Sequence, residues 1–303
     1  MGKDSKLGLV GLVLLVGVVL GVALALHFAQ KSHDHLRYSI EEAYPNESPF
    51  VPGEILARTL VEIMDNELDS TFGWRPNDFF LWGPWLWADN NANRQLGIIQ
   101  GVRDTVRVFR DNLTKISSDE IDRNLLEADT MFRNDAERFL LPSAEGQFKK
   151  GVEALRRYLA NLQTVPPSSR LLNKNKAELM RLFDDWTGLL GDAHANLYRS
   201  KNPDGSPMRM WETDNYFYQA QGTAAVMCYL TPALEREYQD KLNSSLIQHF
   251  HEIEEALEKA AMLKPLVVLD GASDGITANS RKNLDAYVSE ARDKMFSVIE
   301  ELR

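Results

Sequence analysis

Histidine and acidic side chains crowd one stretch of the chain, where His249 and His251 are followed by Glu252, Glu254 and Glu255. Imidazole and carboxylate groups are the ligands that zinc takes from proteins. On a helix, however, the two histidines point about 200° apart and cannot share one ion. Only His251 with Glu254 or Glu255 shares a face. We therefore predict no metal site and no cofactor, and we interpret this stretch as a solvated helix.

Hydrolysis would need a nucleophile beside a histidine base and an orienting acid. Asp192 and His194 stand two residues apart, so they diverge on a helix and indicate surface placement. The sequence has neither the G-x-S-x-G elbow of hydrolases nor the glycine patterns that hold phosphates and dinucleotides. Residues 270–275 begin like a calcium loop, but Ala272 and Arg281 stand where oxygen ligands are needed. We predict no catalytic residue and interpret the protein as acting by binding.

Residues 72–87 form an aromatic stretch that holds four of the six tryptophans. Its candidate binding residues are Phe79, Phe80, Trp82, Trp85 and Trp87. Three interpretations of the stretch are open. The rings could plug the core between helices, dip into the headgroup region of a membrane, where tryptophan is favoured, or form a docking surface for a partner protein or a glycan.

A second candidate set comes from a phrase, W-x3-N-x3-Q, that occurs twice. The two copies are Trp87, Asn91, Gln95 and Trp211, Asn215, Gln219. Within each copy the Asn and the Gln stand four apart, which places them on one helical face. If a pocket gathered the four amides, the phrase would mark a binding site formed by duplication. Otherwise the amides fix helix starts and loops.

Charge and cysteine content restrict the partners. The chain has 34 Lys and Arg against 44 Asp and Glu, a net charge of −10, without the basic cluster that tracks phosphates. We therefore predict no nucleic-acid partner, and the acidity also repels anionic lipid surfaces. The single cysteine, Cys228, lies in the apolar phrase AAVMCYL and is interpreted as a small buried hydrophobic residue.

The N-terminal apolar run indicates the cellular location of the protein. Residues 7–29 contain no formal charge, and at about 1.5 Å per residue they are long enough to cross a bilayer core. A cleaved signal peptide is the alternative, but the run outlasts the roughly 7 to 15 residues of a signal h-region, and its small-x-small triplet at 23–25 lies inside the run. We predict an uncleaved anchor over residues 1–30.

The anchor also suggests orientation and pairing. Lysine and arginine are nearly balanced on its two sides, and the short leader favours an N-inside orientation with a periplasmic body. Gly17, Gly21 and Ala25 recur every four residues and form a face on which two helices can approach closely. This face predicts self-association, unless it reflects only the frequency of glycine in membrane helices.

After the anchor, Pro45, Pro49 and Pro52 predict that residues 31–53 form an extended tether and that the body begins near Glu54. Apolar residues then return at helical spacing, and no run alternates as a strand. This pattern predicts an all-α bundle with helices near 54–70, 91–113, 119–141, 146–163, 173–199, 214–230, 232–263 and 279–302.

The helices suggest a duplication. When Glu54 is aligned with Glu178, the two W-x3-N-x3-Q phrases coincide without a gap, and Arg75 falls on Arg199. The Pro-Pro break after Val165 separates the two halves. We therefore predict two related four-helix units, over residues 54–165 and 171–303.

The phrase ADNNANRQLGIIQGVRDTVRVFRDNL, which follows the aromatic stretch, resembles an uncharacterised family of proteobacterial proteins, a domain of unknown function. The resemblance covers most of the chain and is most specific over Pro84–Leu113. It implies one N-terminal helix in the bacterial inner membrane and a helical body. It brings no catalytic residues.

Together these observations predict a single-pass envelope protein, anchored in the bacterial inner membrane, that acts by protein–protein interaction as a structural or assembly component of a membrane complex. The alternative is an envelope enzyme, or a protein that handles lipids or small molecules, with a pocket between the two helical units.

Overall fold

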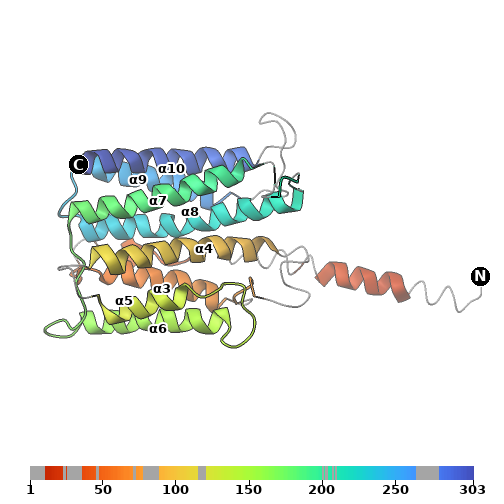
Figure 1. The fold of residues 1–303 in the computed structure, drawn as a ribbon, viewed down its shortest axis with the longest axis horizontal. Helices are drawn as coiled ribbons and strands as arrows, with labels where there is room; N and C mark the ends of the chain where they lie inside the picture. The colour runs from red at the N-terminus through yellow and green to blue at the C-terminus, as the bar shows by residue number, and fades with distance from the viewer. Residues whose placement is uncertain are drawn as a thin grey trace, which may run out of the picture. The chain divides into compact units, whose positions relative to one another are not determined.

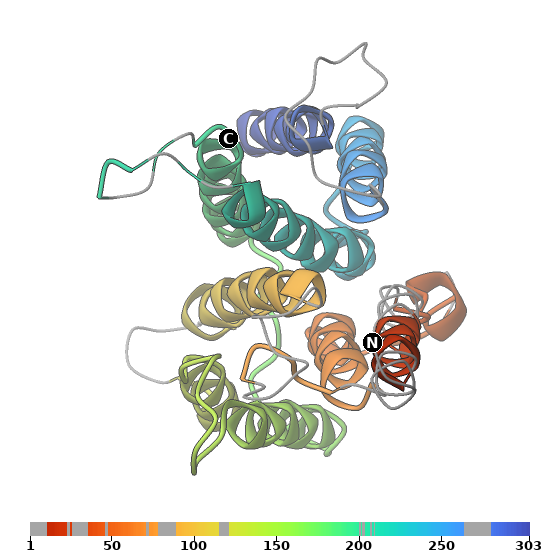
Figure 2. The ribbon, with the colours of Figure 1, turned by 90° about the vertical axis from the view of Figure 1, so that its right-hand side faces the viewer.

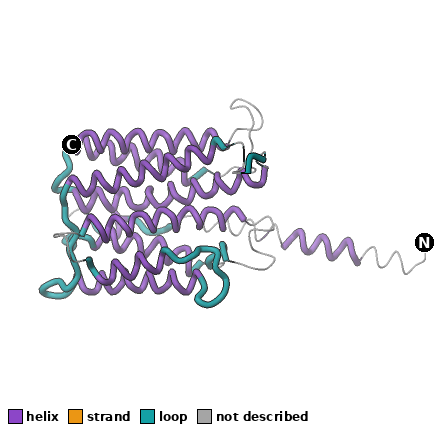
Figure 3. Tube along the Cα trace, in the orientation of Figure 1, coloured by secondary structure: helices purple, strands orange, loops and turns teal. Residues whose placement is uncertain are grey.

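The computed structural model describes residues 11–22, 25, 36–45, 48–70, 73–77, 89–114, 121–199, 201, 204–206, 208, 210–263 and 280–303. Within these ranges the regular structure is helical, with no β-strand (Figure 3). The all-α prediction is thereby confirmed.

The labelled helices run in both directions along one bundle (Figure 1). In chain order the helices are α2 (Ile40–Ala43), α3 (Glu54–Leu68), α4 (Asp89–Val108) continued by the π-helical turn η1 (Phe109–Leu113), α5 (Arg123–Phe132), α6 (Ala144–Leu162), α7 (Lys176–Leu197), α8 (Met210–Tyr238), α9 (Ser244–Ala261) and α10 (Ser280–Leu302).

The chain divides into two compact units, residues 1–37 and residues 38–303. In the first unit residues 11–22 are helical, and the leucines and valines from Leu12 to Val22 are between 42% and 65% exposed. Of the run at residues 7–29, only 11–22 and 25 are described. Among the described helices, none combines the length and the apolar character that crossing a bilayer requires.

The second unit, which we call the body, consists of two groups of helices that meet along α4 and α8 (Figure 2). Helices α3, α5 and α6 lie on the α4 side, and α7, α9 and α10 lie on the α8 side. In the first group α6 packs against α3 and α5, and in the second α10 packs against α7 and α9. These contacts correspond in order along the chain, whereas the packing of α7 against α8 has no equally extensive counterpart between α3 and α4.

Close approach of α4 and α8 depends on glycine. A Cβ added at Gly97 would lie 2.0 Å from the carbonyl oxygen of Gln219, and one added at Gly222 would lie 1.9 Å from that of Arg94. Each helix therefore packs a glycine directly against the backbone of the other. The hydroxyl of Thr223 adds a hydrogen bond to the carbonyl of Gly97, 3.2 Å away.

Helix α5 corrects the prediction of a helix over 119–141, because it covers only Arg123–Phe132. Asp122 begins it by accepting hydrogen bonds from the next backbone amides. At the other end the Arg103 guanidinium donates to the carbonyls of Phe132 and Asn134, each at 2.5 Å. Those side-chain bonds stop the helix, and periodicity in the sequence carries no sign of them.

Helix α8 also differs from prediction, since it passes through Pro232 where a break was expected. Proline removes one backbone donor from the helix. Beside it, the hydroxyl of Thr231 donates to the carbonyl of Met227 at 2.7 Å, and the packing of α8 against its neighbours holds the helix together. The break comes at residues 239–243 instead, where Asn243 caps α9.

The tether predicted over residues 31–53 is shorter than expected. Residues from Tyr38 onward belong to the body, and they include the short helix α2, begun by Ser39. Ile40 and Tyr44 are buried in one cluster with Ile55 and Ala233. Burial of these two apolar side chains therefore holds the segment against the body, although the nearby prolines favour an extended chain.

Candidate functional site

The aromatic residues Phe79, Phe80, Trp82, Trp85 and Trp87 lie outside the described residues. Trp74, which precedes them, is 2% exposed and belongs to the core. Its indole nitrogen donates to the carbonyl of Ala136 at 2.8 Å, and its ring meets that of Phe148 edge-on at 4.9 Å. The start of the aromatic stretch is thus fixed to the body by burial and one hydrogen bond.

The first pair of amides secures the entry to α4. Gln95 is fully buried; its oxygen accepts from the backbone amide of Arg75 at 2.8 Å, and its nitrogen donates to Glu67 at 3.0 Å and to the carbonyl of Gly73 at 3.1 Å. Asn91 accepts from the Arg94 guanidinium at 3.1 Å. These contacts hold the loop before α4 in place.

The second pair joins α8 to α4 through a residue that the phrase does not contain. Asn93 donates to Asn215 at 2.8 Å and accepts from Gln219 at 3.1 Å. The side chain of Trp211 lies outside the described residues. The four amides therefore occupy separate environments and do not gather in one pocket.

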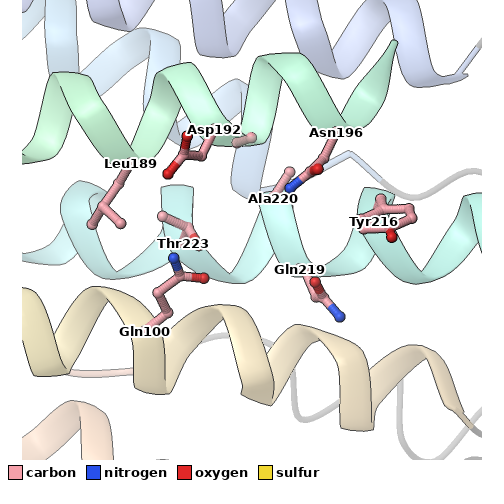
Figure 4. A pocket seen from close by; sticks show the side chains of 9 residues that line it. Gln100, Leu189, Asp192, Asn196, Tyr216, Gln219, Ala220 and Thr223 are labelled. Carbon is pink, nitrogen blue, oxygen red and sulfur yellow. The ribbon is translucent and has the colours of Figure 1, made fainter. Parts of the chain in front are cut away.

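A pocket does lie between α4, α7 and α8 (Figure 4). Its lining residues are Gln100, Leu189, Asp192, Ala193, Asn196, Tyr216, Gln219, Ala220 and Thr223. Its cavity volume is about 30 Å³, which is room for a water molecule or two, whereas pockets for small organic ligands occupy hundreds of Å³. The polar side chains around it can bind water between the two helix groups.

His194 and Asp285 form the arrangement closest to catalytic geometry. His194 Nδ1 lies 2.6 Å from Asp285 Oδ1 and 3.4 Å from Ser289 Oγ. In a hydrolytic triad the acid and the hydroxyl bond to opposite nitrogens of the imidazole. Here both groups face Nδ1, so the arrangement differs from that of a hydrolytic triad, and the imidazole joins α7 to α10. Asp192 points elsewhere, into the pocket.

The histidines of α9 also face different helices. His249 contacts Glu252 at 3.3 Å and Glu301 of α10 at 3.7 Å, while His251 contacts Glu235 of α8 at 3.4 Å. Among the described residues, no three His, Cys, Asp or Glu side chains come together in a way that could hold a metal ion. The Asp270–Gly275 segment lies outside the described residues.

The structure reveals one polar site that no motif indicated, two adjacent residues near the end of α8 that we call the clamp, Arg236 and Glu237. The guanidinium of Arg236 donates to three backbone carbonyls, those of Tyr44 at 3.3 Å, Pro45 at 2.9 Å and Ser48 at 3.1 Å. Arg236 is 7% exposed. It therefore fixes the chain just after α2.

Glu237 binds backbone amides at the start of α3, whereas Arg236 binds carbonyls. Its buried carboxylate accepts from the backbone amides of Gly53 at 3.0 Å, Ile55 at 2.9 Å and Leu56 at 3.3 Å. These first amides of a helix lack acceptors within it, and Gly53 has no side chain with which to cap them. Burial raises the pKa of Glu237 to about 7, while the amide hydrogen bonds oppose that rise.

The clamp could not be found from the sequence, because Arg236 and Glu237 stand among other charged residues in the phrase ALEREYQDK. Adjacent charges on a helix are typical of a solvated face. Only the fold shows that segment 44–56 covers them.

The small-residue face of the apolar run is only partly described. A Cβ at Gly17 or Gly21 would meet nothing within 4 Å, and Ala25 is helical and exposed. The positions are open to a second helix, and self-association through them stays a prediction.

Comparison with known proteins gives one match. The model of a family described as an uncharacterized protein conserved in bacteria, DUF2333, matches residues 3–171. No curated protein and no solved structure matches. The matched region includes the apolar run and ends between α6 and α7.

Proposed function

Because the chain belongs to this bacterial family of uncharacterized proteins, we propose that it is a single-pass protein of the inner membrane whose body acts in the periplasm by binding other proteins. Residues 7–29 would be the anchor, as the sequence predicts. In this role the body would be a structural or assembly component of a membrane complex.

The observation that carries the anchor is the exposure of apolar side chains in residues 11–22. Leucines and valines occupy consecutive positions there, so they surround the helix on every side, and each is more than two-fifths exposed. A helix that is apolar all round needs an apolar environment on every side. The length of the full run at residues 7–29 matches that of a bilayer core.

Binding is favoured over chemistry by the described part of the body. The pocket between α4, α7 and α8 holds no more than a little water, and the imidazole of His194 meets its acid and its hydroxyl at the same nitrogen. The alternative role, an envelope enzyme or a carrier of lipids or small molecules, would need a larger cavity between the helix groups. The aromatic residues from Phe79 to Trp87 are the proposed docking surface.

We also propose that the two helix groups are related four-helix units. Their support is that α6 packs against α3 and α5 as α10 packs against α7 and α9, together with the reciprocal packing of Gly97 on α8 and Gly222 on α4.

The test is crosslinking of the intact chain in native membranes, followed by identification of the linked proteins. We expect a specific partner that is lost when Trp82, Trp85 and Trp87 are changed to alanine and is kept when Tyr198, an exposed aromatic residue elsewhere, is changed instead. Circular dichroism checks that both variants remain folded. An unchanged partner set would overturn the docking surface.

Topology is tested separately with reporters fused after Arg303. A reporter that is active only outside the cytoplasm is expected. Activity only in the cytoplasm, or release of the chain from membranes at alkaline pH, would overturn the envelope assignment.

A further inference from the structure

The pocket between α4, α7 and α8 lies where the two helix groups meet, and most of its lining is polar (Figure 4). Six of the nine lining residues carry a side-chain oxygen: a carboxylate in Asp192, amides in Gln100, Asn196 and Gln219, and hydroxyls in Tyr216 and Thr223. Asp192 carries the single formal charge among these lining residues. A ligand of this pocket must therefore suit oxygen donors and one negative charge.

The two side chains that α8 contributes at the centre of the pocket already use their hydrogens elsewhere. The Thr223 hydroxyl donates to the carbonyl of Gly97 at 3.2 Å, and the Gln219 amide nitrogen donates to Asn93 at 3.1 Å. A hydroxyl whose hydrogen is bound has only lone pairs left, and an amide held through its nitrogen has its oxygen left as an acceptor. Thr223 and Gln219 thus offer acceptor atoms to the pocket.

The carboxylate of Asp192 forms no ion pair within the described part of the chain. By contrast Asp185, on the same helix, pairs with Arg107 at 3.0 Å. The basic residue at the edge of the pocket, Arg199, donates to the Tyr216 hydroxyl at 3.3 Å, and it stands seven residues after Asp192, about 10 Å along a helix. An unpaired carboxylate among acceptor oxygens attracts a cation. Because Asp192 is also exposed, an ion can enter from solvent.

Size and charge restrict the cation. The cavity volume is about 30 Å³, which is room for a group as large as a water molecule. Ammonium and potassium ions are of that size, whereas choline is much larger. Calcium takes about six to eight oxygen ligands, carboxylates among them, and magnesium keeps several of its waters. A pocket with one carboxylate and little volume therefore suits a small monovalent ion.

We propose that the pocket binds one small monovalent cation, ammonium or potassium, which joins the two helix groups. Asp192 of α7 supplies the charge, Thr223 and Gln219 of α8 supply oxygen ligands, and Gln100 supplies an amide from α4. The ion stabilises the folded body, because the unfolded chain does not hold these groups together. This inference goes beyond the proposed function and does not depend on the anchor.

The experiment measures the melting temperature of the full, detergent-solubilised chain by circular dichroism. The chloride salts of potassium, ammonium and choline are compared at equal ionic strength, with choline as the cation that the cavity cannot admit. Asp192→Asn removes the charge and keeps the shape of the side chain. The matched control is Asp184→Asn, which removes an exposed carboxylate of α7 that lies outside the pocket.

At about 100 mM salt, we expect potassium or ammonium to raise the melting temperature by about 3 °C over choline, as a site that is mostly filled would do. Asp184→Asn should keep this rise and Asp192→Asn should lose it. The larger rise identifies which of the two ions the pocket prefers. Equal melting temperatures in the three salts would overturn the inference and leave the pocket to water. A rise that persists in Asp192→Asn would overturn it as well, because the ion would then act at another place.

Discussion

Two adjacent side chains, Arg236 and Glu237, hold opposite ends of one segment through its backbone. Arg236 takes three carbonyls and Glu237 takes three amides. Because backbone groups are the partners, the contacts demand little of the sequence of segment 44–56. The sequence of the segment therefore carries no motif for these contacts, although six hydrogen bonds hold its backbone.

Glu237 should make the stability of the body depend on pH. Its pKa in the folded state, about 7, lies above the ordinary value of 4.5, so the folded state binds the proton more tightly. The contribution of Glu237 to the free energy of unfolding is therefore largest below about pH 4.5 and falls by about 3 kcal/mol as the pH rises to about 7. Chemical denaturation of the detergent-solubilised chain at several pH values measures this slope.

The matched variant is Glu237→Gln, which keeps the shape and an acceptor oxygen but does not titrate. We expect the difference in unfolding free energy between Glu237→Gln and the native chain to change across the interval between pH 4.5 and 7. Parallel pH profiles for the two proteins would contradict the assignment of this proton to Glu237.

Arg236→Ala should release the segment around α2. Loss of the three hydrogen bonds from the buried guanidinium to backbone carbonyls is expected to cost about 2 to 3 kcal/mol of unfolding free energy, and proteases should then cut between residues 38 and 50. Urea denaturation and limited proteolysis measure the two effects. The control is Arg157→Ala, which removes a half-exposed ion pair with Glu127 and should cost less than about 1 kcal/mol. Equal effects in both variants would contradict the role of Arg236.

At the scale of elements, Gly97→Ala and Gly222→Ala should each force α4 and α8 apart. The added Cβ would overlap a backbone carbonyl that has no rotamer to change. We expect each substitution to lower the unfolding free energy by about 3 kcal/mol. Gly188→Ala in α7 is the control, because its Cβ would meet nothing within 4 Å, and greater helix propensity should raise stability by about 0.5 to 1 kcal/mol. Thermal denaturation compares the three, and a stabilising Gly97→Ala would contradict the contact.

The sequence predicted helix bounds well where apolar periodicity determines them. It predicted them poorly where contacts of single side chains determine where a helix ends. Helices α3, α6 and α10 lie close to their predicted ranges because an apolar stripe defines each one. The end of α5 depends on Arg103, a residue far away in the sequence. The passage of α8 through Pro232 depends on tertiary packing. At the candidate site, spacing placed Asn91 and Gln95 on one face, but their partners, Arg94 and Glu67, could not be derived from it.

For the whole molecule, two truncations test where the body begins, which the structure places at residue 38. Removal of residues 1–37 should leave a helical protein that no longer sediments with membranes, because residues 38–303 form one compact unit. Removal of residues 1–53 should also take away the three carbonyls that Arg236 binds and the amide of Gly53 that Glu237 binds. We expect a lower melting temperature for the second protein, measured by circular dichroism. Equal melting temperatures would mean that residues 38–53 do not stabilise the body.

The clamp has a mechanical consequence. A pull on the chain at residue 37 would first meet the buried side chains of Ile40 and Tyr44, which pack against Ile55 of α3 and Ala233 of α8, and then the hydrogen bonds of Arg236. Force would therefore enter the body through α3 and α8 together, and α8 is one of the two helices that join its halves. A load on the N-terminal end of the body would thus be shared between two helices and would not fall on the first turn of α3 alone.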